Sequence, residues 1–483
     1  MKKPDIFKSV RSLPASTAKF LLAAGVSVAL LVIVSGCTTT EQPKIKVGLG
    51  ETIITPPIGT PMRGYSRSDV SKGVHDELYA RALVIEGADS TSIALITIAV
   101  CNMDVKYMDA IREGVNKQTG IPVDNIVISS THTHSGPYIE KSDSDYQKLF
   151  VGRSIQSAVD AWNKRIPGRI GFGSTTVPEL AKNDRRMEYG GLTPDPEAAI
   201  IKVEDAKGKL LGVVFNYGCH PSTLDKHNFL FTEDWPYYSI KGIREALGED
   251  VWVAYYQSAQ GDVKVGYTAE LSAIGADMHG IRTFEYAEYK GNMMVDAVLN
   301  TLPSIQTSGN PVIRTANGYY DYPLRDSYPI SAREAQKQLD EAKAKLAEME
   351  KKADTIGKRV LDRYKVAVFL ADLTANCARW VEDHPNPEPL KNVRHQAIRI
   401  GDAIFVTVPC EVFTEIGLKI KQQSPFEKTF VLGLAAGCPG YIPTAEEFLE
   451  GGYAVVNTHY SPKCENVTIN ACLEQINKMK GDR

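Results

Sequence analysis

Two histidines separated by one residue follow an apolar segment of the chain. Residues 126–128 are Ile-Val-Ile, and His132 and His134 come just before Gly136-Pro137. On an extended chain, side chains at positions i and i+2 point to the same side, so we expect the two imidazoles to project together where a strand gives way to a loop. Neutral imidazole is the commonest protein ligand for zinc. The alternative is a pair of histidines that only form hydrogen bonds.

Three further polar residues follow the ends of apolar segments. His220 comes after residues 211–218, Glu411 after residues 403–408, and Tyr441 after residues 429–436. In α/β sheets, sites form in the crevice beyond the carboxyl ends of strands. Two histidines and a carboxylate, with positions left for water, are the ligand set of a catalytic zinc. Each residue alone is explained as well by a structural role, and the shared position favours a metal site.

Two polar turns supply more candidate residues. Residues 183–186 are Asn-Asp-Arg-Arg, in which Arg185 and Arg186 are adjacent cations, and a solvated turn is the alternative there. The apolar and aromatic segment 252–257 leads into a glycine turn that carries Asp262 and Lys264. Asp262 is a candidate for substrate binding, and a loop cap or an acceptor behind the metal ligands is the alternative.

The segments that must position these residues alternate between strand and helix patterns. Strand-like segments lie at residues 46–55, 80–86, 92–100, 169–172 and 199–203, and helical spacing of apolar residues lies at 104–117 and 150–163. This order predicts an α/β fold, mixed α+β in detail, with a large mixed β-sheet core flanked by helices.

Residues 330–385 differ from the rest in character. Ser331 and Glu334 form a capping box, and apolar residues then recur at spacings of three and four among Lys and Glu. A second helix is expected at about 357–380. We predict a helical insertion at about 330–385 within a single large domain that spans residues 44–483.

The N-terminus has the pattern of an export segment. Five basic residues precede residues 20–34, which are apolar and uncharged, too short for a comfortable membrane span. The sequence Val-Ser-Gly-Cys that ends at Cys37 resembles the lipobox of bacterial lipoproteins. It predicts a signal peptide over 1–36, lipidation of Cys37, a tether over 37–43 and attachment to the cell envelope. An ordinary signal peptide or an uncleaved anchor is the alternative.

The net charge limits the classes of binding partner, and the cysteine count limits the disulfides. Without residues 1–36 the chain keeps 50 basic and 57 acidic residues, a net charge of about −7 with no basic block, which argues against nucleic acid as a partner. Seven cysteines follow Cys37, so at least one thiol is free. Cys464 and Cys472 are the best disulfide candidates in an oxidising compartment.

Several motifs together resemble the neutral/alkaline non-lysosomal ceramidase family in its N-terminal catalytic domain. The hallmark is Thr-His-Thr-His-Ser-Gly-Pro at residues 131–137. Supporting blocks stand in the family's order at residues 54–57, 62–65, 74–76, 79–81, 216–221, 409–411 and 440–444. The resemblance is to short bacterial members, for which the Ig-like C-terminal domain of true ceramidases is not expected.

The resemblance implies a zinc-dependent hydrolase of an amide (N-acyl) bond in a lipid or small molecule. Zinc would be held by His132, His220, Glu411 and Tyr441, and metal-activated water would attack the carbonyl. His134, Arg185 and Tyr441 would stabilise the oxyanion. Arg185 is chosen over Arg186 by its match to an Asn-Arg motif in the family.

One departure from the family bears on the substrate. Ceramidases carry a Gly-Asp-x-Ser-Pro-type motif, but this chain reads Gly-Asp-Val-Lys-Val at residues 261–265, which excludes a serine nucleophile at position 264. Lys264 is a candidate to bind an anionic part of a substrate other than ceramide. Two alternatives stay open: an esterase or sugar N-deacylase acting on a polar substrate, and a surface binding lipoprotein without catalysis.

Overall fold

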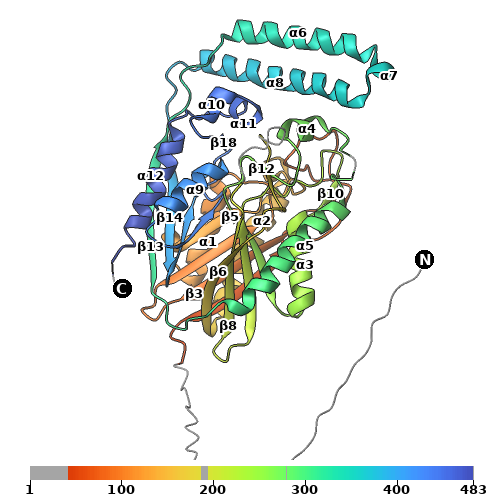
Figure 1. The fold of residues 1–483 in the computed structure, drawn as a ribbon. Coiled ribbons are helices and arrows are strands. Elements are labelled where there is room, and N and C mark those ends of the chain that lie inside the picture. The colour runs from red at the N-terminus through yellow and green to blue at the C-terminus, as the bar shows by residue number, and fades with distance from the viewer. Residues whose placement is uncertain (1–41, 186–193, 279, 482–483) are drawn as a thin grey trace, which may run out of the picture. The chain divides into compact units, whose positions relative to one another are not determined.

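An eight-stranded mixed sheet organises the chain. The computed structural model describes residues 42–185, 194–278 and 280–481, and residues from Gln42 onward form one unit by internal contacts (Figure 1). The strand order is β11-β9-β8-β6-β1-β3-β4-β5, in which β4/β5 and β9/β11 are parallel pairs and the other pairs are antiparallel. The strands are β1 (Lys46–Ile53), β3 (Tyr79–Glu86), β4 (Ser92–Ile98), β5 (Ile126–Ser130), β6 (Ile166–Thr176), β8 (Glu197–Asp205), β9 (Leu210–Tyr217) and β11 (Trp252–Gln257).

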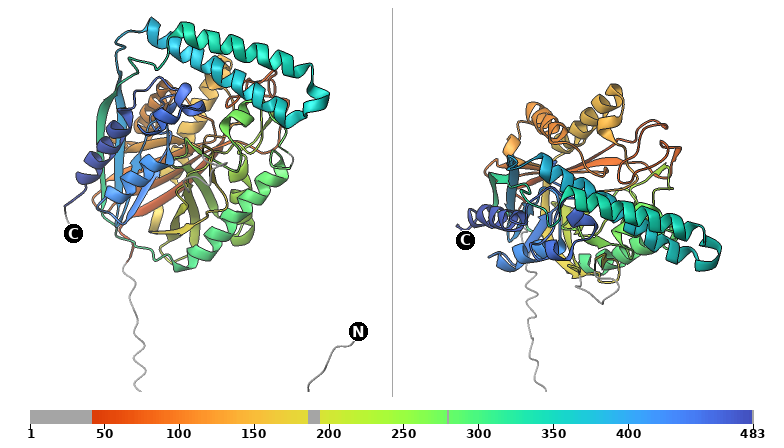
Figure 2. Two further views of the ribbon diagram at one scale, coloured as in Figure 1. Left: turned by 45° about the horizontal axis from the view of Figure 1, so that its top comes forward. Right: turned by 90° about the horizontal axis from the view of Figure 1, so that it is seen from above.

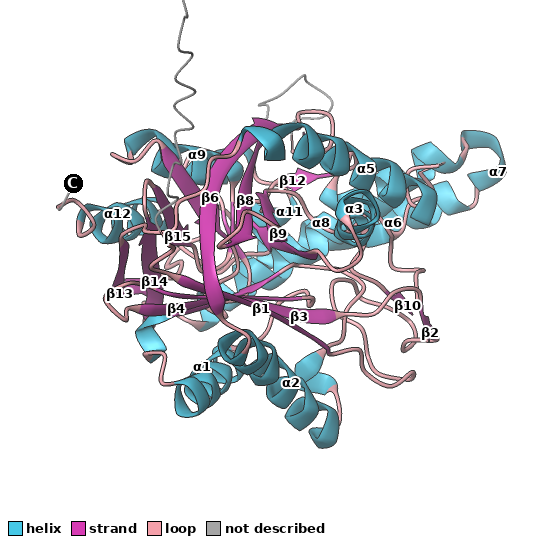
Figure 3. Ribbon diagram, turned by 90° about the horizontal axis from the view of Figure 1, so that it is seen from below, coloured by secondary structure: helices cyan, strands magenta, loops and turns pink. Residues whose placement is uncertain are grey.

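Amphipathic helices cover this sheet because its strands are apolar on both faces. Helices α1 (Val105–Thr119) and α2 (Ser144–Asn163) bury their apolar stripes against β1, β3, β4 and β5. Helices α3 (Trp235–Leu247) and α5 (Phe284–Thr301) pack over β9 and β11. Figure 3 shows α1 and α2 on one side of the strands, and α3 and α5 elsewhere along the sheet.

A second sheet packs against the first. It has the order β13-β14-β15-β17, made of β13 (Ile313–Tyr322), β14 (Leu390–Ile400), β15 (Ala403–Thr407) and β17 (Lys428–Leu432). Phe405 and Phe430 of this sheet meet Phe172 of β6 in a shared apolar core. Helices α9 (Thr414–Gln423) and α12 (Cys464–Asn477) cover its other face. These layers confirm the predicted α/β class.

Three short strand pairs tie together the loops beyond the strand ends. They are β16 (Glu411–Val412) with β18 (Tyr441–Ile442), β12 (Val263–Lys264) with β7 (Lys182–Asn183), and β10 (Leu230–Phe231) with β2 (Gly73–Val74). Most of the candidate site residues lie on these pairs or beside them. The loops are therefore fixed by backbone pairing.

A helical arm, residues 332–383, lies beside the loop-bearing end of the sheets (Figures 1 and 2). It consists of α6 (Ala332–Glu350), α7 (Ala353–Ile356) and α8 (Lys358–Asp383), and α6 packs on α8 through a small apolar core. Helix α8 also contacts α4 (Ala269–Ile274) and α11 (Tyr453–Val456), which follows α10 (Glu447–Glu450). The two helices fall where the sequence predicts them.

The predicted disulfide between Cys464 and Cys472 is wrong. All seven cysteines from Cys101 to Cys472 are free and buried. Cys464 and Cys472 both lie in α12, where eight residues rise by about 12 Å, beyond the roughly 7 Å between Cα atoms that a disulfide tolerates. Among the described residues, no helix is long and apolar enough to cross a membrane. The predicted export segment and Cys37 lie outside the described residues, as does Arg186.

Candidate metal and active site

Two histidines and a carboxylate converge beyond the ends of three strands. The Nε2 atoms of His132 and His220 lie 3.1 and 3.2 Å from the same oxygen, Oε2 of Glu411. His132 follows β5, His220 follows β9, and Glu411 begins β16. All three side chains are buried, and one potential ligand atom from each lies within 4.8 Å of the others.

The far nitrogen of each imidazole is anchored by the backbone. Nδ1 of His132 lies 2.7 Å from the carbonyl oxygen of Cys101, and Nδ1 of His220 lies 3.0 Å from that of Val263. A carbonyl oxygen only accepts, so each Nδ1 carries a proton and each Nε2 faces Glu411. Proteins orient metal-binding histidines in this way. The donor set therefore fits a divalent cation that prefers nitrogen and oxygen ligands.

The charges of the cluster also suit a cation. Burial opposes charge on Glu411, but His132 and His220 outweigh it and hold the pKa of the carboxyl well below its usual range. Burial likewise opposes protonation of His132, yet Glu411 raises the pKa of that imidazole well above its usual value. Burial and Lys264 together lower the pKa of His220 to about 3. The cluster thus holds an ionised Glu411 between a protonated His132 and a neutral His220, and a bound cation would take the place of the proton on Nε2 of His132.

His134 joins the cluster by a route that the sequence did not predict. Strand β5 ends at Ser130, and His132 has a φ of 73°, so the two histidines do not alternate along a strand. The turn at His132 instead brings the two Nε2 atoms to 3.3 Å. Burial, then the neighbouring imidazoles, lower the pKa of His134 well below its usual value. His134 is therefore neutral at neutral pH.

The backbone at Gly64 packs closely against His134. A Cβ atom added at Gly64 would lie 2.6 Å from Cα and Cβ of His134, and Gly64 has a φ of 108°. The next residue, Tyr65, meets the His134 ring edge-on at 4.7 Å between centroids. Residues 62–65 therefore position His134.

Two tyrosines complete this side of the cluster. Tyr441 pairs with Glu411 in the register of β16 and β18. Burial and then the adjacent Glu411 carboxylate, to which it is hydrogen-bonded, raise the pKa of Tyr441 well above its usual value. Tyr453 lies edge-on to Tyr441 at 5.6 Å, and Phe369 of α8 stacks on Tyr453 at 5.8 Å. Sequence reasoning missed Tyr453, because its place depends on how the loop and the arm pack.

Arg185 reaches a different part of the loop layer. Its Nε donates to Oε2 of Glu447 at 2.6 Å, and its Nη2 donates to the carbonyl oxygen of Gly451. The structure therefore places its guanidinium on the segment that leads to Tyr453. Its predicted contact with an oxyanion stays a prediction.

Asp262 and Lys264 are both buried near the cluster and both have protein partners. The two oxygens of Asp262 accept hydrogen bonds from Nδ2 of Asn183 and the backbone N–H of Thr414, each at 2.8 Å. Nζ of Lys264 lies 3.0 Å from Oδ2 of Asp184. Asp262 thus serves as the acceptor that joins the loops, and substrate binding by it or by Lys264 stays a prediction.

Comparison with known proteins agrees with the motifs. The model of neutral/alkaline non-lysosomal ceramidase, N-terminal, matches residues 45–263. The neutral ceramidase of Drosophila pseudoobscura pseudoobscura is 22% identical over 544 residues, which cover 93% of this chain and 76% of that protein. Over residues 45–263 the chain is therefore similar to the neutral/alkaline non-lysosomal ceramidase family. The neutral ceramidase of Pseudomonas aeruginosa is 26% identical over 220 residues, 39% of this chain and 32% of that protein.

Solved ceramidase structures share the fold beyond the matched segment. The crystal structure of neutral ceramidase from Pseudomonas aeruginosa superposes with a TM-score of 0.68 at 17% identity, over 92% of this chain and 76% of that chain. A ceramidase complexed with C2 gives the same TM-score at 16% identity, over 90% and 75%. At this coverage the superposed part of the chain extends well beyond residues 45–263.

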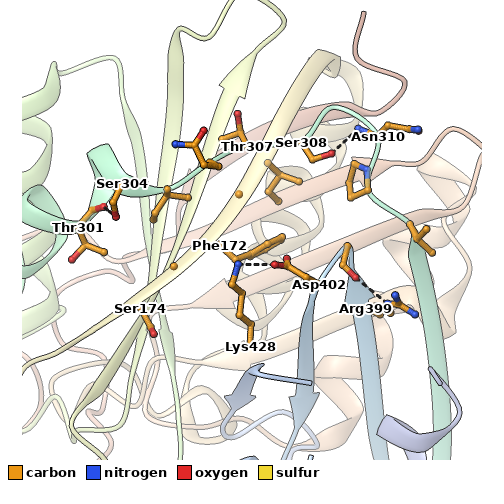
Figure 4. A pocket seen from close by; sticks show the side chains of 18 residues that line it. Phe172, Ser174, Thr301, Ser304, Thr307, Ser308, Asn310, Arg399, Asp402 and Lys428 are labelled. Atoms are coloured by element: carbon orange, nitrogen blue, oxygen red, sulfur yellow. Dashed lines mark hydrogen bonds and ion pairs between the residues drawn. The ribbon is translucent and has the colours of Figure 1, made fainter. Parts of the chain in front are cut away.

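A surface cavity lies away from the ceramidase-like cluster. Its volume is about 670 Å³, and it lies between β6, residues 301–312, the β14–β15 turn with Asp402 and the start of β17 at Lys428 (Figure 4). Figure 4 marks the ion pair between Asp402 and Lys428, the hydrogen bond that the Asn310 backbone N–H donates to Ser308, and the one that Arg399 Nε donates to the carbonyl oxygen of Gly401. None of the residues that line it belongs to the His132–His220–Glu411 cluster.

Proposed function

We propose that the chain hydrolyses the amide bond of an N-acyl substrate with a zinc ion held by His132, His220, Glu411 and Tyr441. The observation that carries the proposal is the pair of imidazoles whose Nδ1–H groups are fixed on backbone carbonyls while both Nε2 atoms face one carboxylate oxygen. The similarity to neutral ceramidases supports the reaction class. Zinc suits two imidazoles and a carboxylate.

A zinc ion, when bound, supplies Lewis acidity and lowers the pKa of a coordinated water to near 7. The residues of this chain bind the substrate and move its protons. His134 is neutral, so its Nε2 is able to accept a proton or, as the other tautomer, to donate a hydrogen bond to the carbonyl oxygen. Tyr441 stays protonated and also donates. A well-placed donor to an oxyanion lowers the barrier by about 3–4 kcal/mol.

Metal content tests the proposal directly. Elemental mass spectrometry of the purified protein should find about one zinc per chain, and His220→Ala should lose it. His384→Ala is the matched control, because His384 is exposed at the end of α8 and contacts Trp380 rather than the cluster. Zinc at one per chain in both variants, or in neither variant nor the wild type, would refute the assignment and favour a binding protein without catalysis.

We also propose that Cys37 carries a lipid that attaches the chain to the cell envelope, on the strength of the Val-Ser-Gly-Cys pattern. Intact mass of the membrane-extracted protein should show an N-terminal acylated cysteine. Cys37→Ala should release the chain from the membrane fraction. Persistence of Cys37→Ala in that fraction would contradict the lipid anchor.

A further inference from the structure

A buried guanidinium lies one aromatic ring away from His134. Tyr65 meets the His134 ring at 4.7 Å on one side. On its other side, Nη2 of Arg282 donates to the Tyr65 hydroxyl at 3.2 Å, and the guanidinium carbon stacks 3.9 Å from the centroid of Tyr267. Arg282 thus stands in the layer next to the cluster.

Arg282 differs from the other two cations of this layer in how its N–H groups are used. Arg67 donates through Nε, Nη1 and Nη2 to three backbone carbonyls, one of them that of His134. Lys264 is paired with Asp184 at 3.0 Å. In Arg282, Nε and Nη1 are buried and have no hydrogen-bond partner within the described ranges 42–185, 194–278 and 280–481.

No protein carboxylate neutralises Arg282 among the described residues. Its Nη2 contacts are neutral, namely Tyr65, the Leu224 carbonyl and Ser272. Asp225 is the acid whose field reaches Arg282, and its carboxylate instead lies 3.4 Å from His227 on the adjoining turn. A guanidinium in this state binds a carboxylate well, since charge-assisted hydrogen bonds are about twice as strong as neutral ones.

We propose that Arg282 binds a carboxylate of the substrate, so that the preferred substrate is an N-acyl amino acid. The inference rests on the proposed amide hydrolysis and names its substrate class. The scissile amide would lie at the His132–His220–Glu411 cluster beside His134. The carboxylate, a few bonds away on the amine side, would lie beyond Tyr65 at Nε and Nη1 of Arg282. Lys264 is the weaker candidate for the anion contact, because its ammonium lies 3.0 Å from the Asp184 carboxylate.

The test compares two amides that differ only at the anionic group. N-lauroylglycine carries a carboxylate where N-lauroylethanolamine carries a neutral hydroxymethyl group. The wild type should hydrolyse the glycine amide with a kcat/KM about tenfold or more above that of the ethanolamine amide. Arg282→Gln should bring this ratio close to one, mainly through KM for the glycine amide, and Arg282→Lys should restore part of the ratio.

Ser272→Ala is the matched control, because it removes a neutral partner of the same guanidinium and leaves the charge in place. Its substrate ratio should stay near that of the wild type. Thermal unfolding midpoints identify any variant that fails to fold, and Arg282→Lys then carries the comparison. A wild-type ratio near one, or a ratio that Arg282→Gln does not change, would overturn the inference.

Binding separates this inference from the proposed function. Calorimetric titration of the protein in chelator with each amide needs no turnover and no metal. Tighter binding of N-lauroylglycine than of N-lauroylethanolamine, lost in Arg282→Gln, supports the carboxylate site even if neither amide is hydrolysed. Equal binding overturns it even if both amides are hydrolysed, which would leave the zinc hydrolase proposal standing with a different substrate.

Discussion

Replacing Lys264 by methionine should destabilise the protein in a strongly pH-dependent way. The side chains of Lys264 and Asp184 are 5% and 4% exposed, and their charged atoms are 3.0 Å apart. Removing one partner of such a pair leaves a buried charge, which costs about 3–5 kcal/mol. Asp184 can take up a proton, which removes the buried charge. From an ordinary pKa of about 3.9, protonation at pH 7 costs about 4 kcal/mol, and at pH 5 about 1.5 kcal/mol.

The cost of protonating Asp184 sets the direction of the pH dependence. In Lys264→Met the loss of unfolding free energy should be near 4 kcal/mol at pH 7 and smaller by about 2.5 kcal/mol at pH 5. Asp184→Asn leaves a buried ammonium, whose deprotonation becomes easier as the pH rises, so its loss should shrink toward pH 9. The double variant Asp184→Asn with Lys264→Met should lie within about 1 kcal/mol of the wild type, because it removes both charges.

Urea unfolding at pH 5, 7 and 9 measures all three variants, and the double-mutant cycle isolates the pair. Turnover of an amide substrate is read on the same samples. A cost below about 1 kcal/mol for Lys264→Met, with turnover lost, would refute the reasoning. Lys264 would then be a substrate contact, as the sequence alone had predicted.

Three further predictions concern the same loop layer. Gly64→Ala should lower turnover while the protein keeps its metal, since the added Cβ would press on His134, and elemental analysis beside kinetics checks this. Tyr453→Phe should leave metal content unchanged and lower kcat, because its hydroxyl is hydrogen-bonded to Tyr441 beside Glu411; an unchanged kcat contradicts this. Burial, opposed by hydrogen bonds, raises the pKa of Asp262 to about 7. The unfolding free energy of the wild type should therefore fall by about 1 kcal/mol per pH unit as the pH rises from 4 to 7, relative to that of Asp262→Asn. Parallel pH profiles of the two proteins in urea unfolding would disprove this.

The strands and most of the candidate ligands could be predicted because their cause is local. Apolar segments such as 211–218 and 403–408 become buried strands, and the polar residue after each one must lie at a strand end. His220 and Glu411 follow from that rule together with the shared edge of the sheets. The period of apolar residues likewise predicts the two long helices of the arm.

The remaining features depend on how distant loops meet. His132 adopts a positive φ that no spacing rule predicts, and the His134 ring is placed by Gly64 from a segment 70 residues earlier. Arg185 donates a hydrogen bond to Glu447 of α10, which is 262 residues away in the sequence and which no spacing rule predicts. The predicted pairing of Cys464 with Cys472 fails since both lie on one helix. Composition around a cysteine indicates its compartment but not its geometry.

The two departures from the ceramidase motifs account for each other. Asp184 interrupts the Asn-Arg motif, and Lys264 replaces the serine of the Gly-Asp-x-Ser-Pro motif. The backbone pairing of β7 with β12 brings these two segments together, with Asn183 opposite Val263, and the new charges then form one buried ion pair. Either charge alone would be costly there, so both changes are needed at once. Because Asp184 neutralises Lys264, Arg282 is the cation that we propose binds the carboxylate of the substrate.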